Sequence, residues 1–342
     1  MIDRAIVWQV TAPRLISCAV VTMVTLSACT SLSPGDPVVG GPVAGGVVGS
    51  GSGSGVGTSQ PTGTAAPSGT PTVAEMTTDA YRAELDRARG PIRDALRKLD
   101  STGGKGLDKR LQQTVAAMER AVSGLETVVP PSAVQAPHAE YVGTLRRLTD
   151  ALADAQDDVQ AQDVCTGPAV LTGVDESGRI SPVRRSGDAL AALGDYPTDV
   201  VPVKVSGEKS RRLRNGAFIK SEGRPGRAYL ELKNGNNQDA VVVLTRGKKK
   251  AISVYVRKKS KFRIHGVRDG KYNVFYTLGV DWDSKARSFT RSCTFEQFGK
   301  SVRFRTIHTA TQIRWTDWTL TLNAVVGGTV KPKRIKPGDF PG

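Results

Sequence analysis

The chain has few of the residues that most often carry enzyme chemistry. Only three histidines and four cysteines occur among its 342 residues, whereas a zinc site needs several such ligands. No G-x-S-x-G motif is present, and His265 and His308 have no visible nucleophile partner. The glycine-rich stretch near the N-terminus is not flanked by a strand and a helix, as a phosphate-binding loop requires. We therefore expect a non-catalytic protein without a metal or cofactor.

Long hydrophobic runs are also missing. The apolar stretch near the start extends only from Leu15 to Leu26, whereas a transmembrane helix needs about 20 apolar residues. It follows a short charged region that contains Asp3, Arg4 and Arg14. This combination is typical of the apolar core of an export signal.

The four residues Leu26-Ser27-Ala28-Cys29 close this stretch. They resemble the lipobox of bacterial lipoproteins, which implies cleavage after residue 28 and a diacylglyceryl group on Cys29. Two acyl chains such as palmitate suffice for stable anchoring. Residues 1–28 are then a signal peptide, and the protein lies on the outer, extracellular side of the cytoplasmic membrane. The alternatives are an uncleaved signal anchor, or a secreted protein that is cut elsewhere.

Residues 29–74 are dominated by Gly, Ser, Pro and Thr. Such a composition has too few bulky apolar side chains to form a core. We expect a disordered tether that separates the folded part from the membrane.

Charge is distributed unevenly along the chain. From residue 204 to the end there are 31 Lys plus Arg and 10 Asp plus Glu, a net charge of +21, and the preceding residues carry 17 and 22, a net of −5. The overall +16 therefore belongs to the C-terminal part. Such an asymmetry favours contact with a polyanion or an anionic surface.

Two cysteines remain once Cys18 leaves with the signal and Cys29 is acylated. Outside the membrane, Cys165 and Cys293 can form a disulfide that joins the helical part to the C-terminal part. Two buried free thiols are the other interpretation, because cysteine is often fully buried.

Residues 75–195 show the spacing of three and four that predicts amphipathic helices. The first run begins at Thr78 or Asp79 as N-cap, and Gly90-Pro91 predicts a kink or break. Two further runs follow, and a shorter helix is expected near residues 184–193. We predict a three- or four-helix bundle. His138 is expected to be a cap or bundle-edge histidine.

Residues 196–212 are interpreted as an interdomain linker. The alternation then changes to two residues, with turn signals at near-regular intervals, and predicts about eight strands. The predicted fold is therefore multidomain: a helical bundle followed by an antiparallel β-sandwich at 213–330 and a C-terminal tail at 331–342.

The C-terminal part contains Asp281-Trp282-Asp283, then Cys293-Thr294-Phe295 with Phe298, then residues 318–323, which read Trp-Thr-Leu-Thr-Leu-Asn. This pattern resembles the C-terminal domain of a group of actinobacterial secreted proteins and lipoproteins. The resemblance covers residues 215–342 and implies a β-sandwich and an extracellular compartment, but no catalytic residues.

Asp281 and Asp283 are the only obvious carboxylate pair of the β region. They suggest an alternative function, a cell-envelope carbohydrate hydrolase, because glycoside hydrolysis uses two carboxylates. A Ca²⁺ site is a weaker alternative, since the further oxygen ligands of an EF-hand are absent. The simpler interpretation is a turn in which the Asp side chains bond local backbone and Trp282 fills the end of the sandwich.

Basic clusters are the stronger signal. The candidate polyanion contacts lie at the two ends of one predicted strand, and residues 211, 212 and 214 supply further arginines. These contacts are Lys248, Lys249, Lys250, Arg257, Lys258, Lys259 and Lys261. Teichoic acid, other anionic wall polymers and anionic lipids would be attracted, less so as salt rises. Nucleic acid is not an expected partner after export, although Tyr255, Tyr272 and Tyr276 could stack bases. No protein partner is indicated.

Overall fold

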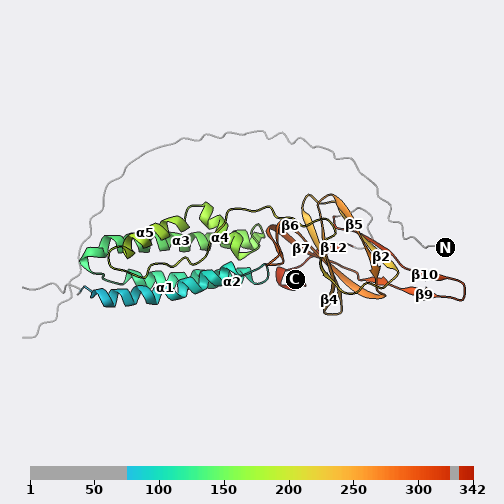
Figure 1. The fold of residues 1–342 in the computed structure, drawn as a ribbon, viewed down its shortest axis with the longest axis horizontal. Coiled ribbons are helices and arrows are strands. Elements are labelled where there is room, and N and C mark those ends of the chain that lie inside the picture. The colour runs from blue at the N-terminus through green and yellow to red at the C-terminus, as the bar shows by residue number, and fades with distance from the viewer. Residues whose placement is uncertain (1–74, 324–330) are drawn as a thin grey trace, which may run out of the picture. The chain divides into compact units, whose positions relative to one another are not determined.

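The computed structural model describes residues 75–323 and 331–342. Five helices precede a mostly antiparallel β region, so the chain is α+β (Figure 1). The predicted signal peptide, Cys29 and the predicted tether lie outside the described residues. No helix within the described ranges has both the length and the apolar character needed to cross a membrane. The helices are α1 (Thr78–Asp100), α2 (Leu107–Glu126), α3 (Gln135–Ala161), α4 (Gly167–Glu176) and α5 (Ile180–Ala191), with the short 3₁₀ helix η1 (Ser132–Val134) before α3.

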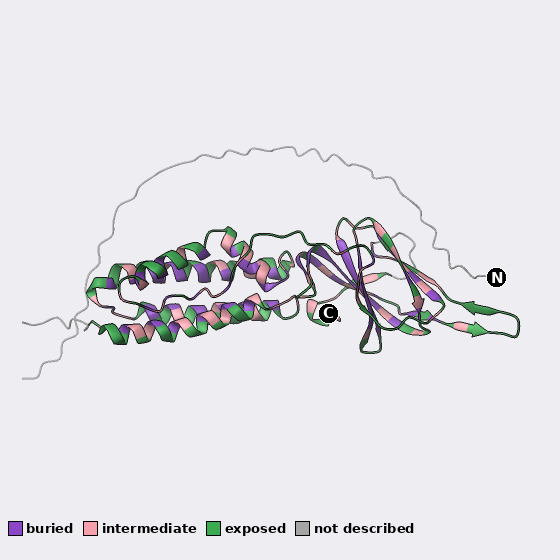
Figure 2. Cartoon of the chain, viewed as in Figure 1, coloured by how far each residue is buried: buried purple, intermediate pink, exposed green. Residues whose placement is uncertain are grey.

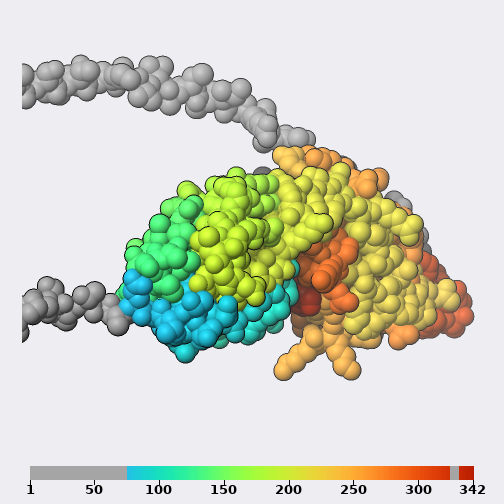
Figure 3. Space-filling model, turned by 60° about the vertical axis from the view of Figure 1, so that its left-hand side comes forward, coloured from blue at the N-terminus to red at the C-terminus, as the bar shows by residue number. Residues whose placement is uncertain are grey.

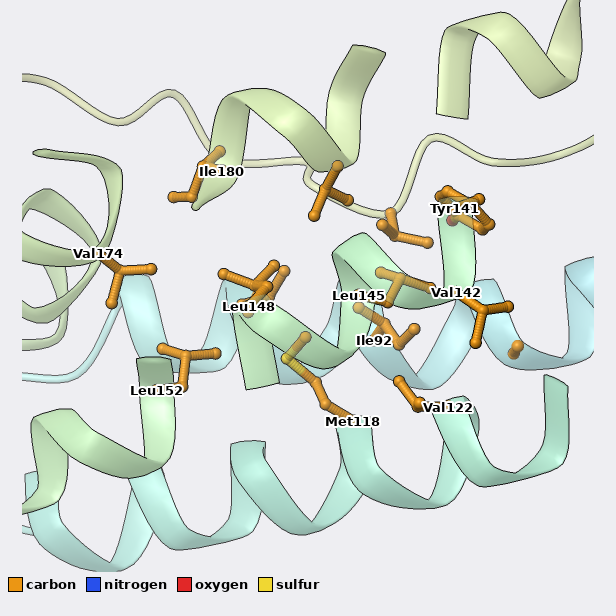
Figure 4. Packing of buried hydrophobic residues seen from close by; sticks show 14 of the residues in the cluster. Ile92, Met118, Val122, Tyr141, Val142, Leu145, Leu148, Leu152, Val174 and Ile180 are labelled. Atoms are coloured by element: carbon orange, nitrogen blue, oxygen red, sulfur yellow. The ribbon is translucent and has the colours of Figure 1, made fainter. Parts of the chain in front are cut away.

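The helices share one hydrophobic core. α1 packs on α2, α2 on α3, and α3 on α5, with the buried positions along their facing sides (Figure 2). Figure 4 shows Ile92 of α1, Met118 of α2 and Leu145 of α3 pointing toward one another, and all three are fully buried. Within each helix the buried residues recur mostly at spacings of three and four, which places them on one face. The predicted three- and four-residue periodicity therefore marks the core positions.

The first helix differs from the prediction at two points. Its N-cap is Thr77, whose Oγ1 accepts a hydrogen bond from the backbone N–H of Ala80 at 3.3 Å. Of the kink or break predicted at Gly90-Pro91, the break is wrong, because α1 continues through Pro91 to Asp100. Proline removes one backbone hydrogen bond from a helix, but Ala88 and Ile92 on either side of it are buried in the core. Packing of this face holds the helix together.

The segment predicted as a linker contributes to the helical core. Tyr196, Val200 and Val203 are buried among the helices, and Tyr141 Oη donates a hydrogen bond to the Thr198 carbonyl at 3.0 Å. Prolines and a lack of periodicity suggest a linker, but they fit equally an extended segment that packs on helices. The sequence also missed α4, while the helix expected near residues 184–193 is α5.

Within the described residues, the β region contains twelve strands rather than the predicted number of about eight. They are β1 (Phe218–Ser221), β2 (Ala228–Asn234), β3 (Asp239–Arg246), β4 (Lys249–Val256), β5 (Ser260–Val267), β6 (Gly270–Asp283), β7 (Ser288–Phe298), β8 (Val302–Phe304), β9 (Thr306–His308), β10 (Ile313–Trp315), β11 (Trp318–Thr321) and β12 (Pro332–Arg334), and the 3₁₀ helix η2 (Pro337–Asp339) follows. The largest sheet has the order β1-β4-β3-β6-β7-β12, with β8 also paired to β6. A second sheet has the order β11-β2-β5, and β9 and β10 form a separate hairpin.

Two details of strand pairing correct the prediction. β10 and β11 are neighbours in the sequence but belong to different sheets, and β11 runs parallel to β2, so the region is not purely antiparallel. Asp317 between them accepts a hydrogen bond from the backbone N–H of Tyr229 at 2.8 Å, at the start of β11. The predicted tail is also part of the β region, because β12 pairs with β7.

The large sheet is covered on both faces. Along β3, Val242 and Leu244 face a cluster that includes residues of the second sheet, whereas Val241 and Val243 face a cluster with Tyr255 and the two cysteines. Because neighbouring residues of a strand point to opposite faces, a strand covered on both sides must be apolar throughout. This explains the unbroken apolar run at the centre of β3.

Candidate polyanion-binding surface

Seven basic side chains lie at the two ends of β4. Lys248, Lys249 and Lys250 form the β3–β4 basic turn, and residues 257–259 with Lys261 form the β4–β5 basic turn. Because β4 is eight residues long and a strand rises about 3.4 Å per residue, the two groups are separated by about 25 Å. The structure therefore does not gather them into one cluster. A partner that contacts both must be extended.

The β3–β4 basic turn projects from the lower edge of the β region (Figures 1 and 3). Lys248 and Lys249 are exposed and Lys250 is half-buried. Burial lowers the pKa of Lys250, and the positive charges of Arg287 and Lys220 lower it further. Cations from three chain segments are thus close enough to repel one another, and an anion bound here would relieve that repulsion.

An acidic residue also lies near this turn. Glu222 interacts with Arg246 at 3.9 Å, and both of these side chains are largely exposed. The carboxylate of Glu222 therefore pairs with Arg246 of β3 and not with the three lysines of the turn.

The β4–β5 basic turn is held in place by backbone groups. Arg257 Nε donates a hydrogen bond to the Leu213 carbonyl at 2.8 Å, and Lys259 Nζ donates one to the Gly235 carbonyl at 2.7 Å. Lys258 and Lys261 are exposed. None of the seven candidate side chains forms an ion pair with an acidic side chain in residues 75–323 or 331–342. Their charge is therefore available to a partner.

Two of the three arginines near residue 212 are not available. The guanidinium of Arg212 donates two hydrogen bonds of 2.6 Å to the carboxylate of Asp239. The buried hydroxyl of Tyr255 also donates a hydrogen bond to this carboxylate. Arg211 binds Asp281 and Asp283. The prediction that these arginines extend the basic surface is wrong for Arg211 and Arg212, because bidentate pairing with carboxylates uses their hydrogen-bond donors. Arg214 is exposed and forms no ion pair within the described residues.

The carboxylate pair of the hydrolase alternative is organised by Arg211. Asp281 is buried, and it accepts bonds from the backbone N–H, Nε and Nη2 of Arg211 at 2.7, 2.8 and 2.7 Å and from Thr290 Oγ1 at 2.8 Å. Asp283 accepts from Arg211 Nη1 and from the backbone N–H groups of Lys285 and Ala286. One guanidinium therefore bridges the two carboxylates, and local backbone satisfies the rest.

The protonation state of this pair follows from its contacts. Burial alone would raise the pKa of Asp281 and Asp283, but the hydrogen bonds from Arg211 and backbone N–H groups outweigh it, and both pKa values are lowered. A general acid in glycoside hydrolysis needs a raised pKa and contact with the sugar. Trp282 between them is buried against Phe289 and Tyr255. The arrangement is that of a structural ion pair.

The tyrosines considered as stacking platforms for bases are not accessible. Tyr255, Tyr272 and Tyr276 are all buried. Their rings contribute to the two clusters on either side of the large sheet, so none of these three tyrosines presents a ring face to a base.

Cys165 and Cys293 are joined by a disulfide bond, with Cα atoms 6.4 Å apart. The surrounding backbone is paired as well. The N–H of Cys165 donates to the Thr290 carbonyl at 2.9 Å, and the N–H groups of Ser292 and Cys293 donate to the carbonyls of residues 163 and 162 at 2.8 Å. The disulfide thus lies in a short strand-like contact between the segment after α3 and β7.

His138 acts as a cap, one of the two predicted roles, because its ring bonds the carbonyl of Leu125 in the last turn of α2, but it is not an edge residue. It is buried inside the helical core, where Nδ1 lies 2.9 Å from Tyr81 Oη and Nε2 lies 3.1 Å from the Leu125 carbonyl. The carbonyl can only accept, so Nε2 carries the proton and Nδ1 accepts from Tyr81. Both ring nitrogens are satisfied, which makes His138 a structural residue.

Two surface features were not predicted. A shallow cleft of about 700 Å³ lies between α1 and the segment 195–199, where Asp199 pairs with Arg89 and Arg93. The β9–β10 hairpin exposes Ile307, Ile313 and Trp315. The sequence signal for the hairpin is its turn, Thr-Ala-Thr-Gln between short β-prone runs.

Chemistry beyond charge is sparse at this surface. Among the residues that the structure describes, no group of three or more His, Cys, Asp or Glu side chains is arranged to hold a metal ion. The site can therefore be described as two lysine-rich turns on a rigid sheet. Comparison with known proteins adds no relative: no family model, no curated protein and no solved structure matches the chain.

Proposed function

We propose that this chain is a non-catalytic, lipid-anchored protein of the outer face of the cytoplasmic membrane. Its basic β region binds anionic envelope polymer, such as teichoic acid. Acylation at Cys29 supplies the anchor. The helices form a bundle that serves as a spacer or protein-interaction module, and the β region forms a sandwich that presents the basic turns. The common core of α1 to α5 and the cluster between the two sheets support this architecture.

The observation that carries the proposal is the division of the cations into two kinds. Arg211, Arg212 and Arg263 are bound to carboxylates, whereas Lys248, Lys249 and the other candidate side chains form no ion pair within the described residues. Arginine suits fixed bidentate pairing, and a lysine ammonium remains a mobile, hydrated point charge. The positive charge of the two basic turns therefore comes mainly from exposed lysines, which suit contact with a flexible polyphosphate.

The disulfide supports the compartment. Disulfides persist in oxidising environments and are rare in the bacterial cytosol. The Cys165–Cys293 bond is therefore consistent with export.

The hydrolase alternative has no support from the geometry. Asp281 accepts hydrogen bonds from Arg211 and Thr290, and Asp283 accepts them from Arg211 and two backbone N–H groups, so the contacts of both carboxylates are those of a structural pair. We do not propose it further.

The test measures binding to poly(glycerol phosphate), a teichoic acid mimic, at low and high salt. The protein is the full chain with Cys29→Ala, which prevents acylation. Neutralising four exposed lysines (K248Q, K249Q, K258Q and K261Q) should weaken binding about tenfold, because each exposed ionic contact contributes roughly 0.3–1 kcal/mol. Wild-type binding should also fall as salt rises.

The matched control removes four exposed cations from the helical region, three on helices and one between α1 and α2. Its substitutions are K98Q, K105Q, K109Q and R120Q, which change net charge by the same amount. It should bind the polymer like wild type. Equal loss in both variants would show that only net charge matters, and no binding at low salt would eliminate the proposal.

A further inference from the structure

The β9–β10 hairpin is the most exposed apolar element of the β region. It extends away from the sheets in Figure 1, and β9 and β10 pair only with each other. Ile307, Ile313 and Trp315 are 42%, 41% and 40% exposed. An isolated two-stranded hairpin is marginally stable in water, and large apolar side chains grouped at the surface mark contact sites.

The hairpin has two different faces. In the antiparallel register Ile313 lies opposite His308 and Trp315 lies opposite Thr306, while Arg314 lies opposite Ile307. Because alternate residues of a strand share a face, Ile313 and Trp315 project together on one side and Arg314 projects on the other. One side therefore carries Ile313 and Trp315 beside His308 and Thr306, and the other carries Arg314 beside Ile307.

The charged side chains within the hairpin segment itself are of one sign. Residues 303–316 contain Arg303, Arg305 and Arg314 and no Asp or Glu. Asp269 approaches the base of the hairpin, but its carboxylate accepts bonds from the N–H and hydroxyl of Thr306 at 2.7 and 2.9 Å. Arg314 Nε donates to Gln312 Oε1 at 3.0 Å within the hairpin. The charge of the hairpin is thus complementary to an anionic surface.

We propose that the β9–β10 hairpin docks into the headgroup region of an anionic lipid bilayer. Ile313 and Trp315 enter the boundary with the acyl chains, and Arg305 and Arg314 reach the lipid phosphates. Tryptophan favours this boundary because its ring is apolar and its N–H is polar, and arginine extends its charged end toward the headgroups. A hydrophilic wall polymer would satisfy the arginines but would leave the isoleucine and tryptophan in water.

This inference deepens the proposed function and rests on it only for the compartment. The hairpin contains none of the lysines that were assigned to polymer binding. A lipid-anchored protein is held near the bilayer, so a weak second contact suffices to orient it, because tethering raises the local concentration of the membrane.

The test uses the full chain with Cys29→Ala and vesicles of phosphatidylglycerol with phosphatidylcholine, or of phosphatidylcholine alone. Removing both apolar side chains (I313S with W315S) should weaken sedimentation with the anionic vesicles about tenfold, because part of the transfer of two large side chains is lost. The matched control, L193S with V280S, removes two exposed apolar side chains elsewhere and should bind like wild type.

A second readout follows Trp315 directly. The difference in fluorescence between wild type and W315F isolates this tryptophan from the others. Its emission should shift to shorter wavelength, and brominated lipid should quench it, only with anionic vesicles. A Trp315 signal that is unchanged by vesicles would overturn the inference.

The outcomes separate this inference from the polymer proposal. The I313S/W315S variant should bind poly(glycerol phosphate) like wild type. If the four-lysine variant loses vesicle binding and the hairpin variant keeps it, the hairpin is not the lipid contact. If the hairpin variant instead converts a dimer to a monomer in gel filtration, the occupant is a second copy of the chain and the lipid proposal is wrong.

Discussion

At the scale of single residues, the cations of the β region divide by their partners. Arg211 holds Asp281 and Asp283 and anchors the chain to the end of β6, where Asp281 adopts a left-handed backbone conformation with φ of 57°. The backbone carbonyl of Arg211 also accepts a hydrogen bond from the N–H of Trp282 at 2.9 Å. Asp281 and Asp283, which suggested catalysis from the sequence, therefore have a structural role: they hold the segment at Arg211 against the end of β6. The lysines of the two turns keep their charge for a partner.

We expect Asp281→Asn to lower the free energy of unfolding by about 2 kcal/mol. Breaking a buried ion pair costs about 3–5 kcal/mol, but Arg211 is 40% exposed, and solvent screening reduces the loss. Urea denaturation measures the effect. Asp283→Asn is the control and should cost less, because an Asn oxygen can still accept from the N–H groups of residues 285 and 286. Equal losses would contradict the central role of Asp281.

His138 predicts a pH dependence of stability. Burial lowers its pKa, and the hydrogen bond with the Leu125 carbonyl opposes this only in part. The unfolded chain takes up a proton near pH 6.5, whereas the folded chain does so only at lower pH. Stability from the neutral ring is therefore complete above about pH 6.5 and is lost as the pH falls from there toward the folded pKa.

We expect His138→Gln to reduce this loss between pH 7 and 5 and to cost about 1–2 kcal/mol at neutral pH, because buried hydrogen bonds are disturbed. Thermal unfolding at several pH values measures both effects. The exposed His308→Gln serves as the control and should retain the wild-type slope. A slope that is unchanged in His138→Gln would show that another group titrates.

At the scale of elements, close approach of backbones positions α4, a helix that the prediction missed. Gly167 begins this helix, and a Cβ atom there would lie 1.7 Å from the Leu99 carbonyl oxygen of α1. The N–H of Gly167 donates to the Thr102 carbonyl at 2.9 Å. Only glycine fits, because the neighbouring atoms are backbone and cannot rotate away.

Gly167→Ala should therefore destabilise the protein by about 1–3 kcal/mol, the usual cost of overpacking. Gly173, in the same helix, is the matched control, because no atom lies within 4 Å of its added Cβ. Gly173→Ala should be neutral or stabilising by up to about 1 kcal/mol. Chemical denaturation of the two variants tests the prediction, and similar signs for both would contradict it.

At the scale of the whole molecule, a disulfide bond joins the helical region to the β region. The Cys165–Cys293 disulfide spans 128 residues, and backbone hydrogen bonds accompany it. Each region has its own hydrophobic cluster, so each has a basis for separate unfolding.

Replacing both cysteines by serine should lower stability by about 4 kcal/mol, as expected for a disulfide that closes a long loop. Calorimetry should also resolve two transitions in the variant where wild type shows one, because the link between two cores is weakened. Wild type with added reductant provides the control and should reproduce the variant. A single transition in all three samples would show that non-covalent contacts alone couple the regions.

The sequence by itself determined that helices precede strands, the core positions of α1 to α3 and the concentration of positive charge after residue 204, since periodicity and composition are local properties. It could not determine that segment 196–205 packs on helices, that β11 pairs in parallel with β2, or that Arg211 uses the charge of Asp281. Those outcomes depend on which distant segments meet: Arg211 and Asp281 are 70 positions apart, and local patterns contain no information about such partners. Tertiary structure therefore decided which charges remain at the surface and which apolar side chains remain exposed.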